Sequence, residues 1–376
     1  MDWEPIASSP TAHVRRRGRF LVVDIVGPHR VFSTSPRNGG QADHVRYLVN
    51  HQSCEGGGHH ERSPVIVDQG QEAYHDIVCA EVELPSDATV TMGTAANMNY
   101  AACVVERDVE VEVTAVVTAG VRTNAVCAGD PATWRETRDG IVKAPAVAGT
   151  INTLLLINTP VQVGALMRVA VTMTEAKSAA LQQLAVPSCY SSDLATGTGT
   201  DQFALAAPMS GEAPLTSASP HTKFGEIVGR AVRQATVEAL RWQNGLEASF
   251  TRSLFHALGR YGVKEATIVA DLSEYLSARD LELLGRNSQA VFFEPLVGAA
   301  AHALGAVLDR ARHGTIPASA MREAMVQQAA TLAVSLAAQP DRWVEFRAKL
   351  HARPSLEPKA LVLAAVALGW SEKWRQ

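Results

Sequence analysis

The segment Ile151-Asn-Thr-Leu-Leu-Leu-Ile157 and the apolar spacing of residues 164–184 are the strongest fold signals in the chain. The first segment is almost continuously apolar, which is typical of a strand buried on both faces of a sheet. In the second, apolar residues recur at steps of three and four, which predicts a helix with one core-facing stripe. That stripe consists of Leu166, Val169, Met173, Ala176, Ala180 and Leu184. Together they predict a sheet covered by helices.

The flanking sequence extends this pattern. Residues 19–26 and 31–35 are predicted to be the two strands of a hairpin around the turn Gly27-Pro28-His29. Another strand is expected at 202–207. A second helix is expected to begin near Ser219-Pro220, with serine as N-cap and proline in the first turn. Strict alternation of strands and helices is missing, so we predict a layered α+β domain.

The character of the sequence changes after about residue 245. Turns rich in glycine and threonine become scarce, and alanine- and leucine-rich segments dominate. A chain of 376 residues is long enough for two cores. We therefore predict two domains, residues 1–245 and an all-α accessory domain at 246–376. Its helices are expected at 250–261, 273–285, 295–312, 318–338 and 357–370.

Composition argues against several classes of protein. The net charge of −4 is too small to favour nucleic acid or an anionic membrane as partner. No apolar segment reaches the roughly 18 residues of a membrane span, and no signal-peptide core follows Met1. We therefore expect a cytoplasmic protein. The 5 cysteines lack a CxxC pair, so we expect reduced and mostly buried thiols.

Polar motifs occur where strands are predicted to start or end. One is Thr118-Ala-Gly-Val-Arg-Thr-Asn124, followed by Asp130, and another is Gly149-Thr-Ile-Asn152. Glycine lets a ligand approach the backbone, a threonine hydroxyl can act as nucleophile or donor, and asparagine can bind an oxyanion. The alternative is a set of turns whose side chains satisfy local backbone groups.

The heptapeptide Ala195-Thr-Gly-Thr-Gly-Thr-Asp201 is the most unusual motif in the chain. It offers peptide amides, three hydroxyls and a carboxylate, which is also how a phosphate-binding loop is composed. However, it lacks the GK[ST] ending of such loops and precedes a strand instead of a helix. A nucleotide-dependent transferase is therefore the less favoured interpretation.

Two further motifs lie on the predicted helices. Lys177 falls within about 40° of Met173, and so beside the apolar stripe, while Glu175 lies on another side of that helix. We do not expect these two residues to pair. His221 opens the second helix, where a neutral histidine can shuttle a proton. The alternative is a capping histidine above a helical Glu226–Arg230 pair.

A cluster of metal-capable residue types precedes the first predicted helix. It contains His51, Cys54, His59, His60 and Glu61. Its spacing matches no closed zinc pattern, and a run of glycines interrupts it. We predict no metal site.

These motifs, in this order, resemble the adenosylcobinamide amidohydrolases of cobamide salvage. The resemblance runs from Ser33 and Asn38-Gly39-Gly40 to His221-Thr-Lys-Phe-Gly-Glu226, and the helical region beyond residue 245 lies outside it. It implies hydrolysis of the amide that joins the corrin propionate side chain to aminopropanol in adenosylcobinamide. The product, adenosylcobyric acid, re-enters coenzyme B12 assembly. The corrinoid is then the substrate, and the sequence shows no required cofactor.

Such a reaction needs an activated nucleophile, an oxyanion stabiliser and an acid for the leaving amine. By residue type, we expect Asp201 or Glu175 as the base that acts on water and Lys177 or Asn152 as the oxyanion stabiliser. His221 would be the acid, and Thr150 is kept as an alternative nucleophile. The expected substrate-binding residues are Asn38, Gly39, Gly40, Thr118, Asn124, Asp130, Gly149, Thr196, Thr198, Thr200, Thr222 and Lys223.

The sequence lacks a D-x-H-x-x-G motif that would place a histidine on cobalt. We therefore expect the corrin to be held at its amide-rich rim by the Gly/Thr/Asn loops, without a bond from protein to cobalt. A second hypothesis is a non-catalytic corrinoid-binding or sensing protein, with the helical domain as output module. Homo-oligomerisation is compatible with either.

Overall fold

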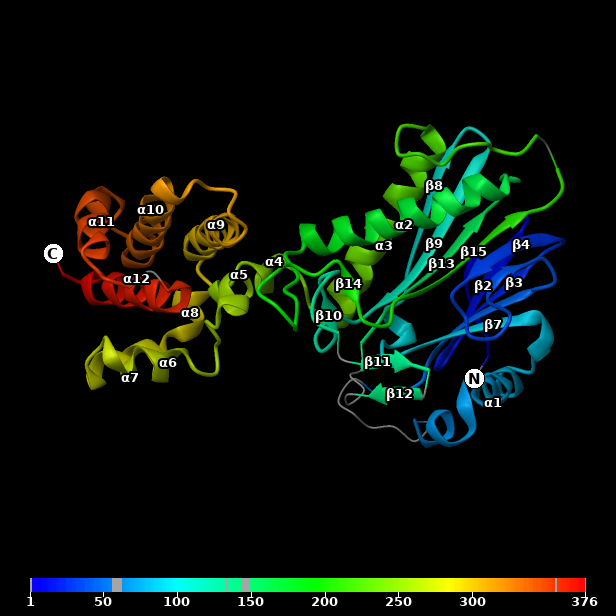
Figure 1. The fold of residues 1–376 in the computed structure, drawn as a ribbon, viewed down its shortest axis with the longest axis horizontal. Coiled ribbons are helices and arrows are strands. Elements are labelled where there is room, and N and C mark those ends of the chain that lie inside the picture. Colours follow the sequence, from blue (N-terminus) through cyan, green and yellow to red (C-terminus); the bar gives the residue numbers. More distant parts are fainter. Residues whose placement is uncertain are drawn as a thin grey trace. The chain divides into compact units, whose positions relative to one another are not determined.

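The computed structural model describes residues 2–55, 63–132, 134–138, 140–143, 149–211, 213–355 and 357–375. The chain divides into two compact units, Met1–Gly245 and Leu246–Gln376. The first unit combines sheets and helices (Figure 1), whereas every regular element in the described part of the second is a helix. The predicted α+β class is confirmed.

Two sheets form the centre of the first unit. The first sheet has five strands, antiparallel except for the parallel last pair. Its strands, in spatial order, are β1 (Glu4–Ser8), β2 (Ala12–Arg17), β3 (Phe20–Ile25), β6 (Tyr47–Gln52) and β7 (Thr89–Thr94). The second sheet has six: β5 (Gly40–Ala42), β4 (His29–Ser33), β15 (Gln202–Pro208), β13 (Ile151–Ile157), β9 (Val111–Ala119) and β8 (Ala102–Asp108).

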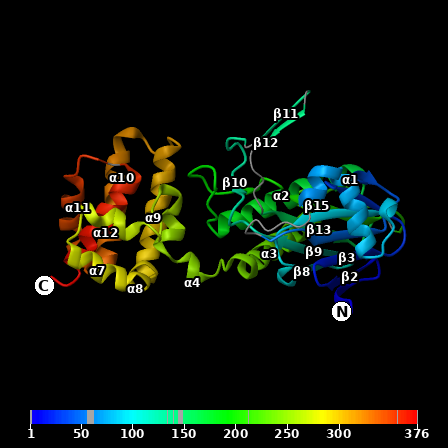
Figure 2. The same cartoon turned by 90° about the horizontal axis from the view of Figure 1, so that it is seen from below.

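Strand β13 lies inside the second sheet, parallel to β15 and antiparallel to β9. Figure 2 shows these strands side by side with β8. Every residue of β13 is buried, which confirms the prediction of a strand covered on both faces. Because β13 and β15 are parallel, both begin at the same edge of the sheet.

The first unit has four layers, in the order helix, sheet, sheet, helices. Leu21, Leu48 and Met92 of the first sheet pack against Leu154 and Ala204 of the second in one apolar core. Helix α1 (Ser63–Glu81) covers the outer face of the first sheet. Helix α3 (Lys223–Asn244) packs on β8 and β9, with α2 (Val163–Gln183) beside it (Figure 1).

Two predictions about local structure are wrong. The expected hairpin does not form, because β3 pairs with β2 and β6, whereas β4 pairs with β15 and β5. The turn at Gly27, with φ of 78°, instead carries the chain from one sheet to the other. The N-cap of α3 is Thr222, not Ser219: its hydroxyl accepts the N–H of Gly225 at 3.1 Å.

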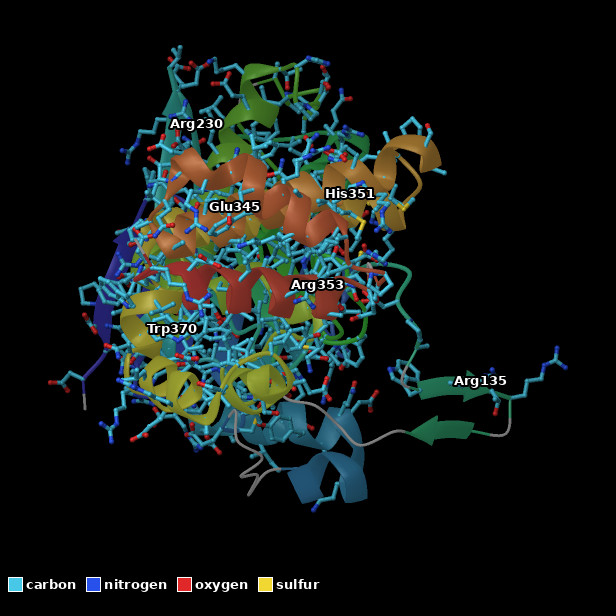
Figure 3. All side chains as sticks on the ribbon, turned by 90° about the vertical axis from the view of Figure 1, so that its left-hand side faces the viewer. Arg135, Arg230, Glu345, His351, Arg353 and Trp370 are labelled. Atoms are coloured by element: carbon cyan, nitrogen blue, oxygen red, sulfur yellow. The ribbon has the colours of Figure 1, made fainter. Side chains whose placement is uncertain are left out.

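Smaller elements complete the first unit. They are the 3-10 helices η1 (Ser86–Ala88) and η2 (Met98–Tyr100), the pair β10 (Ala125–Val126) and β14 (Gly197–Thr198), and the pair β11 (Trp134–Thr137) and β12 (Gly140–Lys143). Figure 3 marks Arg135 on β11 and Arg230 on α3. Cys79 alone of the five cysteines is buried, so the expectation of mostly buried thiols is wrong.

The second unit has its own apolar core, in which Phe292, Leu304, Phe346 and Leu361 are fully or almost fully buried. Its elements are α4 (Ala248–Thr251), α5 (Leu254–Leu258), η3 (Gly259–Tyr261), α6 (Ile268–Asp271), η4 (Leu272–Glu274), α7 (Ala278–Arg286), α8 (Ser288–Phe292), α9 (Pro295–Arg312), α10 (Ala318–Ala337), η5 (Pro340–Arg342), α11 (Trp343–His351) and α12 (Pro358–Glu372). No helix in the described part of the chain is long and apolar enough to cross a membrane.

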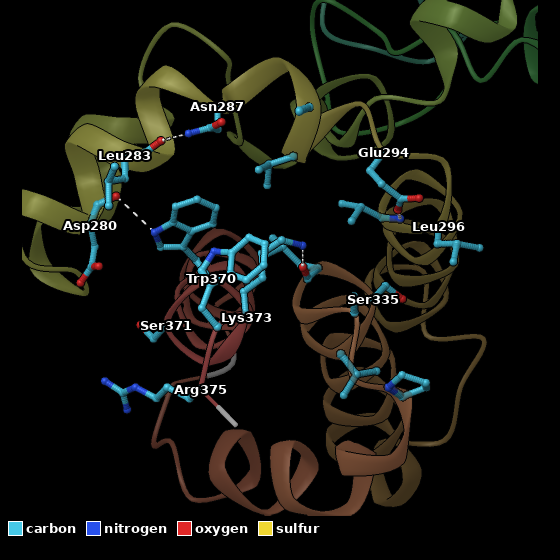
Figure 4. Close-up of a pocket in the computed structure, with 18 residues that line it drawn as sticks. Asp280, Leu283, Asn287, Glu294, Leu296, Ser335, Trp370, Ser371, Lys373 and Arg375 are labelled. Atoms are coloured by element: carbon cyan, nitrogen blue, oxygen red, sulfur yellow. Dashed lines mark hydrogen bonds between the residues drawn. The ribbon is translucent and has the colours of Figure 1, made fainter.

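A cavity of 780 Å³ lies between the ends of α10 and α12 and the segment from α7 to the start of α9. Trp370 projects into this region, and its indole N–H donates to the carbonyl of Asp280 at 3.2 Å (Figure 4). Lys373 donates to the carbonyl of Leu336 at 2.7 Å. These two contacts tie α12 to its neighbours.

Candidate active site

The polar motifs meet at the edge of the second sheet where β13 and β15 begin and β9 ends. Asn152 is the register partner of Thr118 on one side and of Gln202 on the other. The short pair β10 and β14 lies at this edge (Figure 1) and brings Ala125 beside Thr198. Residues 118–126, 149–152 and 197–202 therefore converge through strand pairing.

Lys177 of α2 and Asp201 form an ion pair at this edge, through Nζ and Oδ2. Their side chains are only 15% and 17% exposed. Asp201 also accepts the N–H of Ile151 at 3.0 Å and, from Thr198, the hydroxyl at 2.6 Å and the N–H at 3.1 Å. A carboxylate offers about four acceptor positions, and these four donors occupy them. Asp201 therefore has no acceptor position directed at a water molecule.

The ammonium group of Lys177 is in the opposite situation. It carries three N–H donors, and Asp201 is its one hydrogen-bond partner among the residues that the structure describes. Two donors are left for a ligand. Lys177 was expected beside the apolar stripe of α2. Its low exposure agrees with this position, and the neighbouring Ala176 is buried.

Gly197 provides the space in which the ion pair lies. A Cβ atom built on Gly197 would lie closer than 3 Å to Oδ2 of Asp201 and 2.7 Å from Nζ of Lys177. Any other residue would push one of these charged groups away. The requirement at this glycine is steric, since its φ is not in the left-handed range.

Thr150 and Asn152 flank Ile151, whose N–H donates to Asp201. Both N–H groups of the Asn152 amide are engaged, with Oδ1 of Asn50 at 2.8 Å and the carbonyl of Gly93 at 3.1 Å. The Thr150 hydroxyl donates to the carbonyl of Thr200 at 2.7 Å, and Thr150 is 3% exposed. Of the two expected oxyanion stabilisers, Lys177 has two donors without a partner among the described residues, and both N–H groups of Asn152 are engaged.

The loop residues around the pair are held mainly by each other. Asn124 donates to the carbonyl of Gly149 at 2.8 Å and accepts the hydroxyl of Tyr190 at 3.0 Å. Position 149 requires glycine, because its φ is 136° and a Cβ atom there would lie 3.1 Å from the Cβ of Asn124. Thr200 is exposed, and its hydroxyl donates to the same Gly149 carbonyl at 2.9 Å.

Asp130 and Thr196 brace the outer part of the same loops. Oδ2 of Asp130 accepts the N–H of Cys127 at 2.8 Å and the hydroxyl of Ser188 at 2.6 Å. The Thr196 hydroxyl oxygen accepts the N–H of Ala128 at 2.9 Å. These contacts join the segment after β10 to the segments before β14.

The Asn38-Gly39-Gly40 motif follows β4, whose last residue, Ser33, pairs with Ala204 near the start of β15. The side-chain amide nitrogen of Asn38 donates to the carbonyls of Ser86 at 2.8 Å and Thr89 at 2.7 Å, at the start of β7. Thr89 precedes Gly93 by four residues, or about 13 Å along a strand. The structure therefore places this motif beside the sheet edge but away from the ion pair.

Four further expected residues are not brought to the ion pair. Glu175 is exposed, and its carboxylate lies 3.9 Å from Arg168 on the surface of α2. His221, Thr222 and Lys223 lie at the start of α3. The other end of α3 approaches the cluster, because Asn244 accepts the N–H of Val121 at 3.1 Å. A helix of 22 residues is about 33 Å long, so His221 lies roughly that far from the sheet edge.

Asn50 and His51 are neighbours on β6, and their side chains lie on opposite faces of the first sheet. His51 contacts the hydroxyl of Tyr74 at 2.9 Å, and no cluster of metal ligands occurs among the described residues. His59, His60 and Glu61 lie outside them. Asn50, on the other face, is 1% exposed and was not a predicted site residue. The one sequence signal for Asn50 was that a polar residue follows two apolar residues in Leu48-Val-Asn-His51.

Comparison with known proteins gives the same family as the sequence motifs. The family described as adenosylcobinamide amidohydrolase matches residues 5–248. An uncharacterized protein of Methanocaldococcus jannaschii is 32% identical over 261 residues, which cover 65% of this chain and 96% of that protein. The PH0078 protein of Pyrococcus horikoshii matches with 11% identity over 63% of this chain and 82% of its own, at a TM-score of 0.31.

Proposed function

The chain belongs to the adenosylcobinamide amidohydrolase family, and we propose that it hydrolyses adenosylcobinamide itself. In this reaction the oxygen of water bonds to the carbonyl carbon of the corrin propionate amide, and the C–N bond to aminopropanol breaks. The nitrogen takes up a proton, and the products are adenosylcobyric acid and aminopropanol. The observation that carries the proposal is that the family match includes the whole Lys177–Asp201 cluster.

We propose that the Lys177 ammonium group binds the carbonyl oxygen of the substrate. Negative charge develops on this oxygen during attack, and a fixed cation with unengaged N–H donors stabilises it most where water is scarce. Lys177 meets these conditions, because it is mostly buried and two of its donors have no partner in the described part of the chain. Asp201 then acts as a positioning residue that aims the ammonium group.

Water is the nucleophile that we favour over Thr150. The Thr150 hydroxyl already donates to a carbonyl, and its side chain is buried beneath the loop. A phosphate-binding role for residues 195–201 is also disfavoured. The N–H and the hydroxyl of Thr198 both turn inward to Asp201 and are not presented to a ligand.

The exposed rim of the cluster is where we place the corrin. Gly199 and Thr200 are exposed next to Asn124, and a Cβ on Gly199 would lie 3.2 Å from the Asn124 amide oxygen. Corrin side-chain amides both donate and accept hydrogen bonds, as do the peptide and hydroxyl groups of this rim. We propose binding without a bond from protein to cobalt, so the visible spectrum of the corrinoid should not change on binding.

Product analysis tests the proposal directly. Purified protein is incubated with adenosylcobinamide or, in parallel, with an intact cobamide, and aminopropanol and adenosylcobyric acid are quantified by mass spectrometry. We expect both products from adenosylcobinamide with the wild type and at least about 100-fold slower release with Lys177→Met. Tight corrinoid binding without product would instead support the non-catalytic corrinoid-binding protein. Full activity in a folded Lys177→Met variant would refute the role of Lys177.

A further inference from the structure

Two buried amides face each other between the two sheets, at the end of β13 that also holds Asp201. Asn50 of β6 and Asn152 of β13 are 1% and 0% exposed. The Asn152 amide donates to Oδ1 of Asn50, and the Asn50 amide donates to the Thr118 hydroxyl, both at 2.8 Å. Elsewhere the sheets meet through valine, leucine, alanine and methionine side chains. The two amides therefore form a polar bridge at one end of an apolar interface.

The bridge continues into two more strands. The second N–H of Asn152 donates to the carbonyl of Gly93 on β7, and the N–H of Gly93 donates to the side-chain oxygen of Gln202 on β15 at 3.2 Å. Strands of both sheets are thus fixed relative to one another at the edge where the cluster lies. Fully satisfied buried networks of this kind hold one arrangement of their neighbours.

The bridge connects to the ion pair through the backbone of β13. Asn152 follows Ile151, whose N–H donates to Asp201 at 3.0 Å. Thr150 precedes them and holds the Thr200 carbonyl. A shift of the Asn152 side chain would therefore turn the peptide that holds Asp201, and Asp201 in turn holds Lys177.

We propose that Asn50 is a positioning residue for the hydrolytic reaction. It contacts no substrate in this scheme; it fixes Asn152, and through Ile151 it fixes the direction in which Asp201 aims the Lys177 ammonium group. The inference rests on the proposed function, because it assigns Asn50 a role in that reaction. A leucine at this position would fill the space but break both hydrogen bonds.

The first test compares four variants by steady-state kinetics and urea unfolding. Asn50→Leu leaves the Asn152 amide and the Thr118 hydroxyl without their partner, so we expect lower stability. We also expect kcat to fall by about tenfold or more, with KM changed by less than about threefold. Asn50→Leu/Asn152→Leu should regain part of the lost stability, because the unpaired Asn152 amide is removed, although the Gly93 carbonyl then loses its donor; its kcat should stay low. The milder Thr118→Val removes only the acceptor of Asn50 and should give a smaller loss of kcat.

Thr172→Val is the matched control. The Thr172 hydroxyl donates to the carbonyl of Ala218 at 2.9 Å and is similarly buried; it lies on the same helix as Lys177 but has no hydrogen bond to the ion pair or the bridge among the described residues. We expect it to lose stability with an unchanged kcat. Recovery of kcat in the double variant, or an unchanged kcat in Asn50→Leu, would overturn the positioning role and leave the bridge as a structural feature only.

A second measurement does not depend on hydrolysis. Native protein is acetylated briefly with acetic anhydride, and the modified fraction of Lys177 is measured by peptide mass spectrometry. Asn50→Leu should raise labelling of Lys177 about threefold or more, while Thr172→Val should not change it. If labelling responds but the wild type releases no aminopropanol, the proposed function fails while the coupling of Asn50 to Lys177 stands. If hydrolysis is normal and labelling does not respond, the inference alone fails.

Discussion

Replacing Gly197 with alanine adds one methyl group at the most crowded point of the site. The new Cβ would lie closer than 3 Å to Oδ2 of Asp201 and 2.7 Å from Nζ of Lys177. Ordinary contacts at such an atom begin at about 3.4 Å. One or both charged groups must therefore move by roughly 1 Å, and Lys177 has the longer and more flexible side chain.

The size of the effect follows from that displacement. A misplacement of about 1 Å at a catalytic group lowers a rate by about 100-fold. Overpacking costs about 1–3 kcal/mol of stability when the surroundings cannot relax. The movement of Lys177 lowers this cost, so we expect Gly197→Ala to lose much more activity than stability. The prediction is a kcat about 100-fold lower with an unfolding free energy reduced by less than about 2 kcal/mol.

Gly164→Ala is the control in the same experiment. Gly164 lies in the first turn of α2, the helix that carries Lys177, and a Cβ there meets nothing within 4 Å. Alanine should raise stability by about 0.5–1 kcal/mol and leave hydrolysis unchanged. The assay is aminopropanol release together with urea denaturation for both variants. Wild-type hydrolysis by Gly197→Ala would refute the placement of the ion pair at the reacting amide.

Four further outcomes are expected. Lys177→Met should lower the urea midpoint, and adding Asp201→Asn should restore only part of it, because the unpaired charge is removed but one accepting oxygen becomes an amide N–H group. Hydrolysis should not return; a restored rate would contradict the role of Lys177. Burial lowers the pKa of His29 below the value of about 6.5 that it has in the unfolded chain. The unfolded state therefore binds the proton more readily, and stability falls as the pH drops below about 6.5; His29→Gln should reduce the difference in urea midpoint between pH 7.5 and 5.5, and an equal difference would argue against it. Burial raises the pKa of the Cys79 thiol to about 11, so iodoacetamide at pH 8 should label Cys79 in urea but not in the native protein, as peptide mass spectrometry can show. His221→Ala should keep hydrolysis within about twofold, since His221 lies about a helix length from the cluster; a larger loss would return it to the site.

Long, strongly periodic elements were predictable from the sequence. The expected helices at 295–312 and 318–338 agree with α9 (Pro295–Arg312) and α10 (Ala318–Ala337), because apolar periodicity extends over several turns in each. The expected helix at 250–261 is instead three short elements. Ser253 caps a new helix there by accepting the N–H of His256 at 3.0 Å, which interrupts the first one.

Strand pairing was not predictable in the same way. The turn after β3 has hairpin chemistry, yet β4 pairs with β15, some 170 residues further along the chain. Such long-range pairing depends on side chains packing across the two sheets, and no local signal reports it. The same reason explains why Asn50 was missed, since its role depends on Asn152 of the other sheet.

The candidate site was predictable in composition but not in geometry. Residue types pointed to Lys177 and Asp201 separately, and only the fold pairs them. The same reasoning selected Glu175 and His221, whose chemistry is suitable but which lie elsewhere. Which donors are already engaged, as in Asn152, can be read only from coordinates.

The four donors around Asp201 have a consequence for the energetics of the proposed reaction. They hold the carboxylate, and with it the ammonium group of Lys177, in one orientation before any substrate arrives. In bulk water, dipoles must reorient around a negative charge as it develops, and that reorientation adds to the barrier. In the proposed mechanism the charged groups are already arranged before the substrate binds, so this reorganisation would be largely removed.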